Sequence, residues 1–136
     1  MKNLKNKVIA ITGGATGIGF ALAKTLGSEG AKIVIGEPRK EKLIEAVKSL
    51  KSLDIDATET YLDVTDLGSV EEFAEFTIKS YSRVDMLINN AGISDAQGRI
   101  DGVDITKARK VFDVNFFGVW HGCSVFSKKM IEQGCN

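Results

Sequence analysis

Short apolar segments alternate along this chain with longer segments that repeat apolar residues every three or four positions. The short segments predict four strands, at residues 7–12, 31–35, 57–64 and 84–89. The stretch after the first strand has helical spacing, with Ile18, Leu22 and Leu26 one turn apart. Because strands that alternate with helices form parallel sheets covered on both faces, the pattern predicts an α/β fold.

Two later helices carry signals of their own. Ser69 and Glu72 fit a capping box, in which each side chain bonds to the backbone N–H of the other residue at the start of a helix. A long helix is expected over residues 107–132, after a polar loop, with a break near Asp113.

Length, charge and cysteine content narrow the class of protein. The 136 residues, with no linker or repeat among them, predict one domain. The 18 basic residues balance the 18 acidic ones without any block of like charge, so nucleic-acid and membrane partners are not expected. The apolar run at 8–11 is too short for a signal peptide, and no stretch reaches the roughly 18 to 20 apolar residues of a membrane helix. A cytoplasmic protein without a metal site is expected, with Cys123 and Cys135 as reduced thiols.

Glycines are concentrated between the first predicted strand and the first helix, where the chain reads Thr-Gly-Gly-Ala-Thr-Gly-Ile-Gly from Thr12 to Gly19. Glycine lets the backbone turn tightly and approach a ligand without a side chain in the way. The N–H groups and the positive dipole end of the following helix attract anions. The segment therefore indicates a pyrophosphate-binding loop, with Thr12, Gly13, Gly17 and Gly19 as cofactor-binding residues. The alternative is that these glycines only allow the strand and the helix to pack closely.

An acidic residue follows the second predicted strand, where a dinucleotide-binding fold requires one. Glu37 lies 18 positions after Gly19, and its carboxylate can accept hydrogen bonds from both hydroxyls of the adenosine ribose. The same charge would repel a 2′-phosphate, so NAD is favoured over NADP as the cofactor. Arg39, two residues further on, could weaken this preference. Alternatively, Glu37 is a helix N-terminal charge beside Pro38.

Taken with three further motifs, the glycine loop resembles that of the classical short-chain dehydrogenase/reductase family, and the resemblance covers nearly the whole chain. The family's Thr-Gly-x-x-x-Gly-x-Gly motif is met at residues 12–19 and its Asn-Asn-Ala-Gly motif at residues 89–92. Its Asp after the third strand corresponds to Asp63, and its long-helix asparagine to Asn115. The resemblance implies a Rossmann-like doubly wound sheet of order 3-2-1-4 and NAD-dependent hydride transfer to or from a small alcohol or carbonyl.

The resemblance also implies roles for single residues around the cofactor. Ile18 would donate a backbone N–H to the pyrophosphate. Asp63 and the backbone of Asn90 and Ala91 would border the adenine ring, and Gly92 completes the set of cofactor-binding residues.

The family's proton donor has no counterpart here. That family uses a Tyr-x-x-x-Lys pair, whereas Tyr61 is followed four positions later by Thr65, and Tyr81 by Asp85. The resemblance implies that Asn115 belongs to a catalytic tetrad and positions a water; without the resemblance, Asn115 would be a buried polar residue bonded to nearby backbone. We therefore expect the N-terminal, NAD-binding part of an oxidoreductase, inactive alone. The alternatives are a non-catalytic NAD- or ADP-ribose-binding module and an oligomeric interaction fragment.

Two surfaces predict association with other copies of the chain. In the expected strand order the fourth strand is a sheet edge, apolar on both faces and with unpaired backbone groups. The long helix would expose a set of large apolar side chains: Val111, Phe116, Val119, Trp120 and Phe126. A homo-oligomer is therefore expected.

Overall fold

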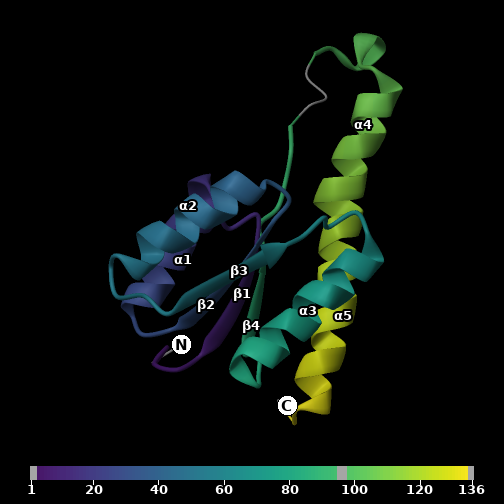
Figure 1. The fold of residues 1–136 in the computed structure, drawn as a ribbon. Coiled ribbons are helices and arrows are strands. Elements are labelled where there is room, and N and C mark those ends of the chain that lie inside the picture. The colour runs from purple at the N-terminus through teal and green to yellow at the C-terminus, as the bar shows by residue number, and fades with distance from the viewer. Residues whose placement is uncertain (1–2, 95–97, 135–136) are drawn as a thin grey trace.

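The computed structural model describes residues 3–94 and 98–134, and these contain a parallel four-stranded sheet (Figure 1). Its strands are β1 (Val8–Thr12), β2 (Lys32–Glu37), β3 (Ala57–Tyr61) and β4 (Met86–Asn89). They lie in the order β3-β2-β1-β4, so that Ile9 of β1 has Ile33 of β2 on one side and Met86 of β4 on the other. The predicted α/β class and strand order are confirmed, and the winding of the chain reverses between β1 and β4.

Helices cover both faces of this sheet. Their bounds are Gly17–Ser28 for α1, Lys40–Lys51 for α2, Leu67–Tyr81 for α3, Ile105–Phe112 for α4 and Gly118–Glu132 for α5. Figure 1 shows α1 and α2 on one face, α3 and α5 on the other, and α4 extending the line of α5 beyond the sheet. A 3₁₀ turn at Ile100–Gly102 precedes α4, and a π-helical turn at Asp113–Phe117 joins α4 to α5. Within the described ranges, no helix combines the length and the apolar character needed to span a bilayer.

The strands send alternate side chains into two hydrophobic cores, one under each pair of helices. Ile9 and Ile35 pack with α1 and α2, whereas Val34 packs with Phe73 of α3 and Phe126 of α5. The rings of Phe73 and Phe126 lie 5.5 Å apart between centroids. Full burial of each such side chain stabilises the fold by about 1.5 to 3 kcal/mol, so the sheet is held from both faces and its carboxyl edge is fixed in place.

The start of α3 differs from the predicted capping box. Asp66 is the N-cap, and its Oδ1 accepts a hydrogen bond from the N–H of Gly68 at 2.9 Å. Ser69 lies inside the helix, where its Oγ accepts from the N–H of Asp63 at 3.0 Å. The prediction was wrong because Asp66, three residues earlier, is an equally suitable cap. Ser69 instead fixes the turn that follows β3.

The buried face of α1 also differs from the predicted stripe. Ile18 is 75% exposed. The buried positions of α1 are the small residues Gly19, Ala23 and Gly27. Small residues allow α1 to approach the sheet closely, which leaves the first turn of the helix and its N–H groups at the sheet edge.

The apolar surface of the last helices is partly as predicted. Phe116 and Trp120 are exposed, and Phe112 and Phe117 join them. Phe126 is 1% exposed, against expectation, because α5 packs this side chain on α3. The sequence pattern could not show which helix lies opposite α5.

Candidate functional site

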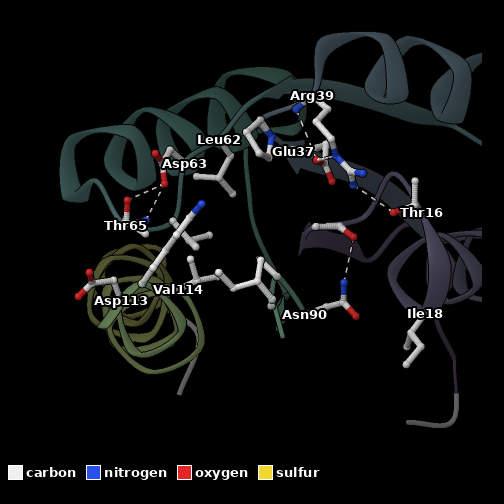
Figure 2. A pocket seen from close by; sticks show the side chains of 17 residues that line it. Thr16, Ile18, Glu37, Arg39, Leu62, Asp63, Thr65, Asn90, Asp113 and Val114 are labelled. Carbon is white, nitrogen blue, oxygen red and sulfur yellow. Dashed lines mark hydrogen bonds and ion pairs between the residues drawn. The ribbon is translucent and has the colours of Figure 1, made fainter. Parts of the chain in front are cut away.

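A cavity of about 780 Å³ opens at the carboxyl edge of the sheet, where the strand order reverses. Its walls come from the loop after β1, the turns after β2 and β3, the segment after β4 and the end of α4 (Figure 2). Seven of the eleven site residues predicted from the sequence line it: Gly13, Ile18, Glu37, Asp63, Asn90, Ala91 and Gly92. The cavity lining does not include the other four, which are Thr12, Gly17, Gly19 and Asn115.

The glycine loop joins β1 to α1 at one end of this cavity. Gly13 and Gly17 have φ angles of +63° and +54°, in the left-handed region that favours glycine. A Cβ on Gly13 would lie 2.9 Å from the Cα of Ala91, and a Cβ on Gly19 would collide with the carbonyl of Gly13. No side chain caps the start of α1, and its first turn has no acidic residue. The N–H groups and the dipole of α1 can therefore receive an anion here.

Thr12 and Asn90 tie the ends of β1 and β4 together behind the loop. The Oγ1 of Thr12 accepts from the N–H groups of Asn90 and Ala91, both at 3.0 Å. The Nδ2 of Asn90 donates to the carbonyls of Thr12 and Gly13, at 3.1 and 2.9 Å. Thr12 is 2% exposed, so water cannot readily replace these bonds. Both residues therefore position the glycine loop.

Glu37 ends β2 in the cavity wall with its side chain only 4% exposed. The Nε of Arg39 donates to Oε1 of Glu37 at 2.6 Å. The Nη2 of the same guanidinium donates to Oγ1 of Thr16 at 3.2 Å (Figure 2). The hydrogen bond to Glu37, and then its negative charge, raise the pKa of Arg39 above the ordinary value. The buried carboxylate thus has a permanently charged partner.

Asp63 stands in the wall at the turn after β3. Its Oδ1 accepts from the N–H of Thr65 at 2.9 Å and from the hydroxyl of Thr65 at 2.7 Å (Figure 2). Its own N–H is held by Ser69, as described above. These bonds fix the direction of the carboxylate, and the side chains of Leu62 and Val114 supply an apolar surface of the same cavity. A flat, hydrogen-bonding ring could be held at this end.

Asn115 lies in the π-helical turn and bonds to the chain after β4. Its Nδ2 donates to the carbonyl of Ile93 and its Oδ1 accepts from the N–H of Ile93, each at 2.9 Å. Without the family resemblance, Asn115 was expected to be a buried polar residue bonded to nearby backbone. The bonding is as expected, but the burial is not, because Asn115 is exposed.

One part of the wall, from α4 and the turn after it, was not predicted from the sequence. Lys110, Asp113 and Val114 line the cavity. They lie far along the chain from the glycine loop, and only tertiary packing brings them to it. No local signal in the sequence could have identified them.

Comparison with known proteins identifies the family. A family model described as short chain dehydrogenase matches residues 7–135. The chain belongs to this family. Among curated relatives of the chain, the uncharacterized oxidoreductase YxbG of Bacillus subtilis is 32% identical over 134 residues, which are 98% of this chain. The resemblance drawn from the motifs is confirmed.

Solved structures give the same result. NAD+-bound xylitol dehydrogenase matches with a TM-score of 0.93 and 28% identity, over 97% of this chain. A short-chain dehydrogenase/reductase from Burkholderia phymatum in complex with NAD matches with a TM-score of 0.92 and 31% identity, over 98% of this chain. The chain covers 49% of YxbG, 51% of the xylitol dehydrogenase and 47% of the Burkholderia protein. It therefore corresponds to about half the length of the relatives that it matches, and to their N-terminal part.

Proposed function

We propose that residues 1–136 form the dinucleotide-binding domain of a short-chain dehydrogenase/reductase that transfers hydride between NAD and a small alcohol or carbonyl. The observation that carries this proposal is the order of features along one cavity. An uncapped helix start lies at one end, the buried carboxylate of Glu37 follows, and the wall at Asp63 and Val114 lies beyond it. This is the order of the pyrophosphate, ribose and adenine in a dinucleotide.

Each part of the adenosine half then has a partner. The pyrophosphate would lie at the start of α1, with the N–H of Ile18 as a donor. Glu37 would accept from the ribose hydroxyls, and Asp63 with the backbone of Asn90 and Ala91 would border the adenine. When bound, NAD supplies the hydride-transfer chemistry, and the residues of this chain bind and orient it.

The carboxylate of Glu37 supports NAD as the preferred cofactor. It stands where the ribose hydroxyls would donate, and its buried charge would act against a 2′-phosphate at the same place. The two relatives of known structure named above were solved with NAD, which supports a dinucleotide in this cavity.

The proton donor of the reaction is not among these residues in our proposal. Neither Tyr61 nor Tyr81 lines the cavity, and neither is followed by a lysine four positions later. Desolvation, followed by its 2.7 Å hydrogen bond to Asp56, raises the pKa of Tyr81 far above the ordinary value, so this phenol stays protonated. We infer that Asn115, which corresponds to the family's tetrad asparagine, contributes to catalysis by holding the segment at Ile93.

The decisive experiment compares two substitutions at the helix start whose side chains have the same shape and differ in charge. Gly17 has a left-handed φ, which Asp and Asn tolerate better than other residues, and a Cβ there has nothing within 4 Å. Calorimetry should show that Gly17→Asn binds NAD within a few fold of wild type and that Gly17→Asp does not bind. Wild type that fails to bind NAD at millimolar concentration, or Gly17→Asp that binds like Gly17→Asn, would contradict the proposal.

A non-catalytic module that binds NAD or ADP-ribose is the second candidate. It is favoured by the observation that every partner identified in the cavity belongs to the adenosine diphosphate half of the ligand. Titration with ADP-ribose beside NAD separates the two functions. Equal affinities would show that the nicotinamide end makes no contact with this chain.

We also propose that the protein forms a homo-oligomer. Phe112 at the end of α4, Phe116 in the π-helical turn and Trp120 in α5 are 64%, 55% and 66% exposed, and β4 is one edge of the sheet. Such surfaces favour association. Sedimentation should find a dimer or larger species, and a monodisperse monomer would refute this part. The cytoplasmic location expected from the sequence stays a prediction.

A further inference from the structure

His121 is the one histidine of the chain, and it joins α5 to the turn after β3. Its Nδ1 lies 2.9 Å from the carbonyl oxygen of Val64, and its side chain is half-buried. Because a carbonyl can only accept, Nδ1 carries the proton of the neutral imidazole. The cavity lining includes Val64 and not His121. Any effect of this histidine on a ligand therefore acts through Val64.

The turn that His121 contacts is one wall of the cavity. Residues 62–65 all line the cavity, and they are held from three elements. The N–H of Leu62 donates to the last carbonyl of β2 at 3.3 Å. The N–H of Asp63 donates to Ser69 of α3 at 3.0 Å. His121 adds the tie to α5.

Another part of the wall is built at the start of the same helix. Asp113 and Val114 line the cavity from the π-helical turn, and α5 begins directly after this turn, at Gly118 (Figure 2). A Cβ on Gly118 would lie 2.7 Å from Cγ2 of Val64, so the start of α5 contacts Val64 closely. His121 lies three residues later on the same face of the helix and bonds to the carbonyl of Val64. α5 thus continues from one part of the wall and holds the other.

We propose that His121 is a positioning residue that fixes the spacing between these two parts of the wall, and thereby the width available to the adenine ring. The inference rests on the proposed dinucleotide site. Val64 is 7% exposed, so water cannot readily replace the donor that its carbonyl would lose. Without the imidazole, the turn after β3 can shift relative to α5. Both the affinity for the dinucleotide and the selectivity for its base would then fall.

Calorimetric titration of the whole chain with NAD and with etheno-NAD, whose adenine carries an additional fused ring, tests this. Wild type should prefer NAD by at least about tenfold, the usual effect of an added group in a fitted pocket. His121→Leu, which removes the donor, should weaken NAD by about three- to tenfold and reduce the preference to about threefold or less. The ratio is decisive, because a general loss of folded structure would weaken both ligands by the same factor.

Two further variants separate the hydrogen bond from general destabilisation. His121→Asn carries an N–H donor at the place of Nδ1, so its preference for NAD should return to within about twofold of wild type. Tyr81→Phe is the matched control. It breaks the 2.7 Å hydrogen bond from a helix to Asp56, which precedes β3 at the opposite edge of the sheet. Its preference should equal that of wild type.

NMR of the imidazole nitrogens tests the same contact without a substitution. Because the chain has one histidine, its signals need no assignment. With the imidazole neutral, the spectra should show the proton on Nδ1, as the bond to Val64 requires. The signals should shift when ADP-ribose is added, because the ligand would contact the turn that His121 holds.

The outcomes distinguish this inference from the proposed function. NAD binding by wild type without preference over etheno-NAD, or a preference that His121→Leu retains, overturns the role of His121 and leaves the dinucleotide site standing. A proton on Nε2, or a His121→Asn variant that behaves like His121→Leu, also overturns it. Failure of wild type to bind NAD overturns the proposed function, and this inference with it.

Discussion

The side-chain amide of Asn115 bonds to both backbone groups of Ile93, at 2.9 Å each. A primary amide offers the same donor and acceptor as a peptide unit, so Asn115 acts on this segment as a neighbouring strand would. Gln133, at the end of α5, does the same at the other end of β4, where its amide bonds to the N–H and the carbonyl of Val84. The chain on either side of the edge strand is thereby tied to the helices that pack on it.

Asn115→Leu is expected to loosen the segment after β4. Leucine is of similar size but has no donor or acceptor, so two hydrogen bonds are lost and the free energy of unfolding falls by about 1 to 3 kcal/mol. Amide hydrogen exchange at Ile93 should accelerate. Asn115→Asp is the matched control, because its carboxylate can accept from the N–H of Ile93 but cannot donate to the carbonyl, and its effect should be intermediate. Equal protection of Ile93 in wild type and Asn115→Leu would disprove the pairing.

Thr12→Val is expected to destabilise the junction of β1 and β4. Valine fills the same volume, but the N–H groups of Asn90 and Ala91 lose their shared acceptor in a place that is closed to water. The free energy of unfolding in urea should fall by about 1 to 3 kcal/mol, the usual cost of a buried unpaired polar group. Thr12→Ser keeps the oxygen and should remain within about 1 kcal/mol of wild type. A valine variant as stable as the serine variant would show that the hydroxyl does not hold the loop.

The sequence was sufficient for the architecture and for seven of the residues that line the cavity. The alternation of strands with helices predicted the parallel sheet, and the family resemblance carried by the motifs implied its strand order. Gly13, Glu37 and Asn90 each directly follow or end a strand, so their place at the carboxyl edge of the sheet could be predicted from local pattern alone. Parallel strands bring such positions together whatever the intervening helices contain.

Features that depend on contacts between distant segments could not be predicted. The predicted third strand, 57–64, ends at Tyr61, the last residue paired with β2, because a strand ends where its neighbour ends. The hydrogen bond from Arg39 to Thr16 could not be predicted either, because the two residues are 23 positions apart in the chain. Lys110 reaches the cavity only because α4 extends the line of α5 beyond the sheet.

Gly122→Ala is expected to force α5 away from β4. A Cβ at Gly122 would collide with Oδ1 of Asn89 and lie 3.2 Å from Cδ2 of Leu87. The overpacking should cost about 1 to 3 kcal/mol of unfolding free energy, more than the roughly 1 kcal/mol that alanine gains over glycine in a helix. Gly102→Ala is the control, since a Cβ there meets nothing within 4 Å. Thermal unfolding should therefore distinguish the two variants, and a Gly122→Ala protein as stable as wild type would contradict the close approach.

Asp85 connects the start of β1 to the segment before β4. Its side chain is 8% exposed, and its carboxylate accepts from the N–H of Val8 at 2.9 Å and from Nζ of Lys7 at 3.0 Å. The Nε of Arg83 also donates to it, at 2.9 Å. Burial alone would raise the pKa of Asp85, but the bonds from Val8, Arg83 and Lys7 outweigh burial and hold the pKa below the ordinary value of 3.8.

This lowered pKa predicts a specific dependence of stability on pH. Because the folded state binds the proton less tightly than the unfolded state, ionised Asp85 stabilises the fold above the unfolded pKa of 3.8, and this contribution is lost as the pH falls through the folded value. Asp85→Asn should therefore be less stable than wild type at neutral pH, with the gap closing below pH 3.8 in urea titrations. Asp101→Asn serves as the control, because Asp101 and its partner Arg99 are 67% and 89% exposed and their ion pair contributes little at any pH. A gap between wild type and Asp85→Asn that stays constant as the solution is acidified would show that the carboxylate is not stabilised by its partners.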